Sequence, residues 1–318
     1  MTTPDTKSRL EAAFKNAPTG GPLVPYKGER PDAPEWFLKA IETPYETGET
    51  NVHDTQIQWQ RWGDLTKPGL LFLHGNGAHS HWWDFIAPYF SNDYHCIALS
   101  LSGMGQSGWR DEYRKEIYID EVIAVAEATG LFSHSQKPIL AAHSFGGLIG
   151  RLTLAQHSEK FLHGIIIDSY IPLPSEEFSR PPSNPNRSRI YEDLATALGR
   201  FRLAPPQLCE NHYILDYIAR WSLKKVDGGY TWRFDPRIWG DAHKFVDEAE
   251  TLRQISCPLT FMMGKDSLFY SPKVFKFLRE ILGESLPIVS IPHAQHHVWL
   301  DQPIAFISAL DAVLKLVG

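Results

Sequence analysis

The sequence predicts an α/β protein with a mostly parallel, doubly wound sheet and an inserted, mainly helical cap. Short stretches that are apolar at every position, such as Gly69–Leu73 and Ile139–Ala142, alternate with stretches whose apolar residues recur at helical spacing. Strands that are apolar on both faces are typical of a parallel sheet covered by helices on two sides. From residue 172 to 249 the alternation stops, and it resumes at Pro258.

The elements follow from this alternation. Each predicted strand is a short apolar or alternating run bounded by turn residues. The strands are expected at Glu46–Val52, Gln56–Trp62, Gly69–Leu73, Tyr94–Ser100, Ile139–Ala142, Gly164–Asp168, Pro258–Met263 and Leu286–Ile291, with His53 and Asp54 as a hairpin turn. Each predicted helix repeats its apolar residues every three or four positions. The helices are expected at Pro34–Ile41, Lys115–Thr129, from Ser144 to His157, Pro272–Leu282 and Pro303–Val317.

Three regions are predicted. Residues 1–33, rich in proline, glycine and charge, form an N-terminal arm that is expected to be extended or loosely packed. The sequence does not choose between an arm that packs on the core, one that clasps a partner and one that is disordered. Residues 34–171 and 250–318 form the sheet domain, and residues 172–249 form the cap, with helical patterns at Ile190–Gly199 and Pro206–Leu223. The cap is rich in aromatic residues (Trp221, Tyr230, Trp232, Phe234, Trp239), which favours a lid over an apolar substrate.

Composition excludes several classes of function. The 318 residues carry a net charge of -6 and scatter their lysines and arginines, which argues against a nucleic-acid partner. The N-terminus lacks an apolar leader, and no run approaches the roughly 20 apolar residues of a membrane span. The three cysteines (Cys96, Cys209, Cys257) are isolated, as in reduced intracellular proteins, so a cytoplasmic protein is expected. Nothing in the sequence predicts an oligomeric state.

The segment Pro138–Gly147 carries the strongest chemical signal. A short apolar strand runs into Ser144, and apolar residues at helical spacing follow it. A strand that turns into a helix within two residues needs little bulk on either side of the turn, and Ala142 and Gly146 provide it. Ser144 would then lie at the N-terminus of a helix, where backbone N–H groups and the helix dipole favour a developing anion.

Further polar residues follow the other predicted strands. His74, Gly75 and Asn76 follow one strand, and Asp168, Asp266 and His296 each follow another. Because the carboxyl ends of parallel strands meet at one edge of a sheet, these side chains are expected to gather there. Serine, carboxylate and histidine in this chain order indicate nucleophilic catalysis.

Motifs along residues 35 to 318 resemble the α/β-hydrolase superfamily in their order. They are Trp62-Gly63, His74-Gly75, Ser102–Gly108, the Ser144 turn, and His296 seven residues before Pro303. Ala142 replaces the first glycine of the usual Gly-x-Ser-x-Gly pattern. The resemblance is closest to capped esterases, epoxide hydrolases, dehalogenases and carbon–carbon bond hydrolases. A serine rather than an aspartate at the turn argues against the second and third of these.

The resemblance implies catalytic roles. Ser144 is the expected nucleophile and His296 the expected base, with His293 and His297 as alternatives. The acid is Asp168 or Asp266, and Asp168 is favoured. In Gly264–Ser267 a serine falls where most members carry the acid, whereas some members use the strand that ends at Asp168.

Supporting residues are also expected. The backbone N–H groups of Asn76 and Phe145 would bind the oxyanion, and His74 would bond loop backbone. Trp82, Trp83, Phe145 and Tyr170 would line a substrate pocket, with core packing as an equal alternative for one of the two tryptophans. The pairs His79/His81 and His293/His296 have spacings that a metal could use. Without a His-Glu-x-x-His motif or clustered carboxylates, no metal and no cofactor is predicted.

The predicted function is a serine carboxylesterase that forms an acyl-enzyme intermediate with a small to medium apolar ester as its partner. The same residues also serve amides, lactones, thioesters and vinylogous 1,5-diketones, and the sequence does not choose among them. The alternatives are a carbon–carbon bond hydrolase of ring-fission products and a non-catalytic ligand-binding protein of the same fold.

Overall fold

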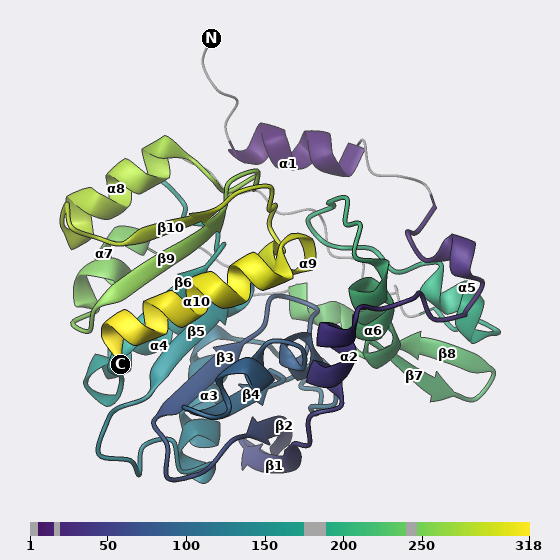
Figure 1. The fold of residues 1–318 in the computed structure, drawn as a ribbon, viewed down its shortest axis with the longest axis horizontal. Coiled ribbons are helices and arrows are strands. Elements are labelled where there is room, and N and C mark those ends of the chain that lie inside the picture. Colours follow the sequence, from purple (N-terminus) through teal and green to yellow (C-terminus); the bar gives the residue numbers. More distant parts are fainter. Residues whose placement is uncertain (1–5, 16–19, 175–188, 240–246) are drawn as a thin grey trace.

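The computed structural model describes residues 6–15, 20–174, 189–239 and 247–318. An eight-stranded sheet runs through their centre in the order β1-β2-β4-β3-β5-β6-β9-β10 (Figure 1). The strands are β1 (Glu46–Val52), β2 (Thr55–Trp62), β3 (Gly69–Leu73), β4 (His95–Leu99), β5 (Ile139–His143), β6 (His163–Ile167), β9 (Leu259–Gly264) and β10 (Ile288–Ile291). The predicted α/β fold with a mostly parallel sheet is confirmed.

Six strands that are adjacent in the sheet, β4, β3, β5, β6, β9 and β10, run parallel to one another. At the edge of the sheet, β2 pairs antiparallel with β4, and β1 pairs antiparallel with β2. His53 and Asp54 form the two-residue loop between β1 and β2, both at positive φ (45° and 60°). Positive φ at both central residues is the geometry of the hairpin turn that matches strand twist. The predicted hairpin is therefore present.

The two faces of the sheet are buried in two separate apolar clusters. Alternate residues of a strand belong to different clusters: Phe72 points to one face, and Leu71 and Leu73 point to the other. This alternation is the two-residue period of an extended strand. Since both faces are covered, every residue of β3 is buried, and its sequence is apolar throughout.

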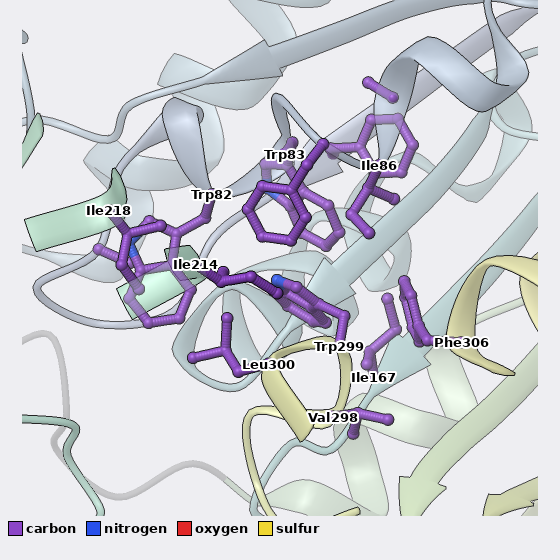
Figure 2. Packing of buried hydrophobic residues seen from close by; sticks show 14 of the residues in the cluster. Trp82, Trp83, Ile86, Ile167, Ile214, Ile218, Val298, Trp299, Leu300 and Phe306 are labelled. Carbon is purple, nitrogen blue, oxygen red and sulfur yellow. The ribbon is translucent and has the colours of Figure 1, made fainter. Parts of the chain in front are cut away.

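Helices divide between these faces. Buried side chains of α3 (Lys115–Ala128), α4 (Phe145–His157), α7 (Glu248–Gln254) and α8 (Pro272–Leu282) belong to one cluster. Those of α2 (Glu35–Ile41), α6 (His212–Trp221), α9 (Val298–Asp301) and α10 (Pro303–Val317) belong to the other. Figure 2 shows part of this second cluster, in which Trp82, Trp83 and Trp299 lie with Ile214 and Ile218 of α6. Helices α8 and α10 have the predicted bounds.

The prediction of an extended or loosely packed N-terminal arm is wrong for its described residues. Thr6–Lys15 form a helix, α1, and Val24–Tyr26 form a short 3-10 helix. Leu23 is 2% exposed, Tyr26 Oη lies 3.0 Å from His212 Nδ1, and Arg220 donates to the Gly28 carbonyl. The partners that order this segment lie about 190 residues away in the chain, where local composition gives no sign of them.

The predicted cap, residues 172–249, is called the insert below; its residues 175–188 and 240–246 lie outside the described part. It holds α5 (Leu194–Leu198) and α6, both shorter than the helical patterns predicted. It also holds a hairpin of two strands, β7 (Leu223–Val226) and β8 (Gly229–Trp232). The prediction of a mainly helical cap did not include this hairpin. Asp227 and Gly228 form its two-residue loop, and Asp-Gly is a strong sequence signal for a hairpin of this kind.

Across the described residues, no helix combines the length and the apolar character that crossing a bilayer requires.

A buried ion pair joins α4 to the start of α7. Arg151 is completely buried, and Glu248 is 3% exposed. The guanidinium donates to both carboxylate oxygens, with 3.0 Å between Nη2 and Oε2. It also donates to Ser169 Oγ (2.7 Å) and to the Tyr170 carbonyl. A buried charge is tolerated only when it is paired and hydrogen-bonded in this way.

Glu248→Gln should lower the free energy of unfolding by about 3–5 kcal/mol, because it leaves the Arg151 charge buried without its counterion. Urea unfolding measures the change. The matched control is Glu280→Gln, which removes the exposed partner of Lys276 and should have little effect. Equal stability of the two variants would contradict this account of the ion pair.

Candidate active site

Ser144 occupies a sharp turn between β5 and α4. Its backbone has φ 54° and ψ -117°, a region that costs a non-glycine residue energy and persists only where surrounding contacts impose it. The Ser144 N–H donates to the Ile167 carbonyl of β6 (3.0 Å), and the Ser144 carbonyl accepts from Ser169 Oγ (2.7 Å). The side chain is half-buried. The predicted turn is therefore present, with Ser144 at its apex.

Small residues allow the helix to approach the sheet at this turn. A Cβ on Gly146 would collide with the His74 carbonyl oxygen. A Cβ on Gly150 would lie 2.8 Å from the Cβ of Ala142. Gly150 therefore provides the space that Ala142, which replaces the usual glycine, takes up on the strand. The departure from the common pattern is accommodated one helical turn further along α4.

Ser144, His296 and Asp168 form a hydrogen-bonded chain. His296 Nε2 lies 2.9 Å from Ser144 Oγ, and His296 Nδ1 lies 2.9 Å from Asp168 Oδ1. With the imidazole proton on Nδ1, the ring donates to the carboxylate and its Nε2 accepts from the serine hydroxyl. This is the arrangement in which a histidine serves as base toward a serine. The structure thus brings these three predicted residues together.

The environment of Asp168 distinguishes it from Asp266. Asp168 is completely buried and also accepts from the Gly264 N–H (2.7 Å) and Ser267 Oγ (2.6 Å). Asp266 is exposed, and no hydrogen bond joins its carboxylate to His296 within the described residues. Ser267, at the position where most family members carry the acid, instead donates to the carboxylate on the neighbouring strand.

Burial controls the protonation of the imidazole. His296 is 2% exposed, and desolvation of its charged form lowers its pKa to about 3. Burial also raises the pKa of Asp168, an effect that the Ser267 and Gly264 donors oppose. A neutral imidazole at neutral pH has its Nε2 lone pair available to the Ser144 hydroxyl.

The predicted oxyanion donors belong to the residue that follows Ser144 and to the loop after β3. Phe145 is the first residue of α4, and Asn76 follows Gly75 in the loop after β3. A Cβ on Gly75 would be 3.2 Å from the Ser144 Cβ, so this loop passes close to the serine. His74 holds the loop, because its Nδ1 donates to the Gly75 carbonyl and its Nε2 accepts from the Leu101 N–H. The predicted backbone role of His74 is confirmed.

The predicted pocket residues Trp82 and Trp83 have different surroundings in the structure. Trp83 is completely buried and stacks on Phe72 (4.7 Å between ring centroids) and Trp299 (4.6 Å). It is a core residue, so its assignment to the substrate pocket is wrong. The Trp82 ring lies 5.4 Å from the ring of His297, which lies 4.7 Å from the His296 ring.

Tyr170 borders the site through Phe269. The Tyr170 ring lies 5.6 Å from Phe269, which meets the His296 ring edge to face at 4.9 Å. Phe269 is a site residue that the sequence did not reveal, because it lies in a loop without a recognisable motif.

Two other polar residues at the site were also missed. His143, directly before the serine, donates from Nε2 to the His296 carbonyl (3.0 Å). Gln207 of the insert accepts from both the N–H and Nδ1 of His297, at 2.8 and 2.7 Å. The position of His143 beside the serine was an available signal. Gln207 gave none, since its partner lies 90 residues further along the chain.

Neighbours of Gln207 strengthen its contact with the His296 loop. Asn211 donates to the carbonyls of Leu300 and Asp301, and Cys209 Sγ lies 3.2 Å from the Leu300 carbonyl. The segment 207–211 of the insert therefore fixes the loop that carries His296. His293, one of the alternative bases, is exposed, whereas His297, the other, bonds to the insert.

The histidines with metal-like spacing have other partners. His79 Nε2 lies 3.0 Å from Ser222 Oγ of the insert, and His81 Nδ1 lies 2.7 Å from Asp84 Oδ2. In the portion of the chain that is described, no three side chains of His, Cys, Asp or Glu gather in a way that could hold a metal ion.

The chain belongs to the alpha/beta hydrolase family, whose model matches residues 70–310. It is similar to a serine hydrolase-like protein of Danio rerio, with 24% identity over 82% of this chain and 85% of that protein. It is also similar to an esterase of Mycobacterium tuberculosis, with 22% identity over 80% of this chain and 85% of the esterase.

Among solved structures, the thioesterase domain from the curacin biosynthetic pathway has the same fold. It superimposes with a TM-score of 0.70 and 22% identity, over 84% of this chain and 99% of that domain. The candidate site therefore lies within a hydrolase fold, and the family membership expected from the motifs is confirmed.

Buried histidines should make the protein acid-labile. In the described part of the chain, seven have a pKa lowered first by burial: His74, His79, His95, His143, His163, His296 and His297. Unfolded histidines bind protons near pH 6.5, whereas folded His74, His95 and His163 do so only at about 4. Below pH 6.5 the unfolded state binds more protons, so stability falls. The carboxyl groups of Asp168, Glu121 and Asp301 have raised pKa values, so they favour proton binding by the folded state and oppose this loss of stability. These carboxyl groups are fewer than the buried histidines.

Calorimetry between pH 7 and pH 5 should show Tm falling, with about 1.4 kcal/mol of stability lost per pH unit for each net proton taken up on unfolding. His163→Gln, which removes one such group beside Thr260, should make the slope shallower. A Tm that stays constant over this range would show that the buried imidazoles do not titrate as described.

Proposed function

We propose that this chain hydrolyses carboxylic esters through an acyl-enzyme intermediate on Ser144. The observation that carries the proposal is the continuous hydrogen-bonded chain from Ser144 Oγ through the His296 ring to Asp168. The similarity to an esterase and to a serine hydrolase-like protein supports the same class of reaction. Ser144 at the turn supports acyl transfer rather than the aspartate chemistry of epoxide hydrolases and dehalogenases.

In the first step, Ser144 Oγ attacks the ester carbonyl carbon while its proton passes to His296 Nε2. The carbonyl oxygen becomes an oxyanion, which the N–H groups of Asn76 and Phe145 would bind. The tetrahedral intermediate then collapses, the bond from carbon to the alcohol oxygen breaks, and His296 returns the proton to the leaving alcohol.

In the second step, a water molecule attacks the acyl carbon as His296 Nε2 accepts its proton. Collapse breaks the bond to Ser144 Oγ, which regains the proton, and the carboxylic acid is released. Asp168 stabilises the imidazolium that forms in both steps and maintains the ring in the required tautomer. Three groups donate to the Asp168 carboxylate and keep it oriented: the Gly264 N–H, the Ser267 hydroxyl and His296 Nδ1.

Aromatic side chains around His296 favour an apolar substrate. The Trp82 ring lies beside the His297 ring, the Phe269 ring contacts the His296 ring, and the Tyr170 ring contacts the Phe269 ring. These rings offer apolar surface to an acyl or alcohol group. We therefore propose small to medium apolar esters as the substrate class.

Wild-type protein should hydrolyse p-nitrophenyl esters, and Ser144→Ala should lower kcat by at least roughly 10⁴-fold, because it removes the nucleophile. A chain-length series from acetate to dodecanoate, measured by release of p-nitrophenol, gives both results. Circular dichroism verifies that the variant folds. Absence of turnover on every wild-type substrate would reject the esterase assignment and favour carbon–carbon bond hydrolysis or ligand binding.

Asp168→Asn should lower kcat by roughly 10³–10⁴-fold, because an amide neither favours the required tautomer nor stabilises the imidazolium. Asp266→Asn is the matched control and should behave like wild type, since that carboxylate is exposed. The two variants are compared on the preferred p-nitrophenyl ester. Loss of activity in Asp266→Asn with Asp168→Asn active would reassign the acid and leave the reaction unchanged.

A further inference from the structure

A cavity lies among residues that take no part in the Ser144 site. Its volume is about 410 Å³, within the range of small-molecule sites. It is lined by Arg30, Ile41, Tyr45, Tyr217, Arg220, Trp221 and Arg233, and shares no lining residue with the Ser144–His296–Asp168 chain. The cavity forms where the N-terminal arm, the end of α2, helix α6 and the end of β8 meet, and these elements lie together in Figure 1.

Three guanidinium groups line this cavity, and only one of them has a carboxylate partner among the described residues. Arg220 pairs with Asp216 through Nε (2.6 Å). For Arg30 and Arg233, no carboxylate of the described residues lies within ion-pair distance. Arg233 is half-buried, and its desolvation lowers its pKa. A half-buried charge without a counterion is costly, so a bound anion would supply what the protein lacks here.

The cationic groups are oriented before any ligand binds. Arg233 donates from Nε to the Leu223 carbonyl (3.0 Å). Arg220 is fixed on two sides, by Asp216 through Nε and by the Gly28 carbonyl through Nη2 (2.7 Å). Because Arg220 is held by Nε and Nη2 and Arg233 by Nε, these two side chains lose little conformational entropy when their remaining N–H groups bind an anion.

The aromatic walls are equally constrained. The Trp221 indole stacks on His81, with 3.5 Å between ring centroids and 11° between planes. Tyr217 donates its hydroxyl to Asp84 Oδ2 (2.6 Å). Tyr45 contributes a third aromatic side chain. The cavity therefore combines rigid aromatic surface with guanidinium groups.

We infer that this cavity is a binding site for a small aryl anion, an aromatic ring that carries a carboxylate or a phosphate. The planar guanidinium group can form paired N–H hydrogen bonds to two oxygens of a carboxylate or of a phosphate. The ring of the ligand would lie against the Trp221, Tyr217 and Tyr45 walls. This assignment concerns a site separate from the ester hydrolysis proposed above and does not depend on it.

Titration calorimetry on the full chain tests the assignment with four probes. Benzoate and phenyl phosphate represent the two possible anionic groups, and inorganic phosphate and benzyl alcohol each lack one half of the predicted ligand. At least one aryl anion should bind with one-to-one stoichiometry at millimolar or lower concentration, more tightly than the two half-ligands. Added salt should weaken its binding. The tighter of the two aryl anions identifies the anionic group.

Arg233→Gln and Arg30→Gln should each weaken that binding by about tenfold or more, because each removes charge-assisted hydrogen bonds. Arg30 is exposed, so its variant tests the site even if Arg233→Gln unfolds, which circular dichroism would reveal. The matched control, Arg279→Gln, removes a guanidinium from a different cavity on α8 and should leave binding unchanged.

Three results would overturn the assignment. No aryl anion binds at millimolar concentration, or the affinity is the same in Arg30→Gln and Arg233→Gln as in wild type, or inorganic phosphate binds as tightly as phenyl phosphate. The second result would place the ligand elsewhere, including at the Ser144 site, and the third would remove the role of the aromatic walls.

Discussion

Close packing of α4 against the sheet produces the conformation of Ser144, on which the geometry of the candidate site depends. Gly146 lets the helix meet the His74 carbonyl, and Gly150 leaves room for Ala142. The chain can leave β5 and enter α4 at this distance only by turning sharply, with Ser144 at φ 54°. That turn places the hydroxyl at the sheet edge where Asp168 and the His296 loop arrive. A larger residue at position 146 or 150 would push the helix away and remove the reason for the turn.

Burial then determines the electrostatics around this serine. Desolvation lowers the pKa of His296 and keeps its ring neutral. An exposed histidine would be partly protonated near its ordinary pKa. Asp168 is in an equally buried position, but donors from Ser267 and the Gly264 backbone stabilise its charged form. The exclusion of water therefore lowers the pKa of His296 and raises the pKa of Asp168, and only at Asp168 do hydrogen-bond donors oppose the effect. A similar principle applies to Arg151 and Glu248, whose charges are tolerated because they are fully paired.

The insert contributes to two places at once. Its segment 207–211 holds the loop after His296 through Gln207 and Asn211. Its helix α6 presents Trp221 and Arg220 to the N-terminal arm, where the arginine-lined cavity forms. The base of the candidate site and the arginine-lined cavity are thus both built partly from one inserted region.

Local sequence pattern predicted the strands of a mostly parallel sheet, the helices α8 and α10, the turn at Ser144 and the family. Each of these depends on local pattern: apolar runs of strand length, helical spacing, or small residues around one serine. The sequence also proposed both carboxylates, Asp168 and Asp266, as partners of His296. It could not exclude Asp266, because both follow buried strands.

Tertiary structure alone decided which carboxylate faces His296, that Trp83 belongs to the core, and that the N-terminal arm packs on α6. It also revealed Gln207, Phe269 and the cavity around Arg233. The physical reason is the same in each case. Burial and hydrogen bonding are set by partners outside the local segment, from 27 residues away for Phe269 and His296 to 216 for Trp83 and Trp299, with Gln207 and His297 and Arg220 and Gly28 between these extremes. Local sequence carries the propensity of a segment but not the identity of what it packs against.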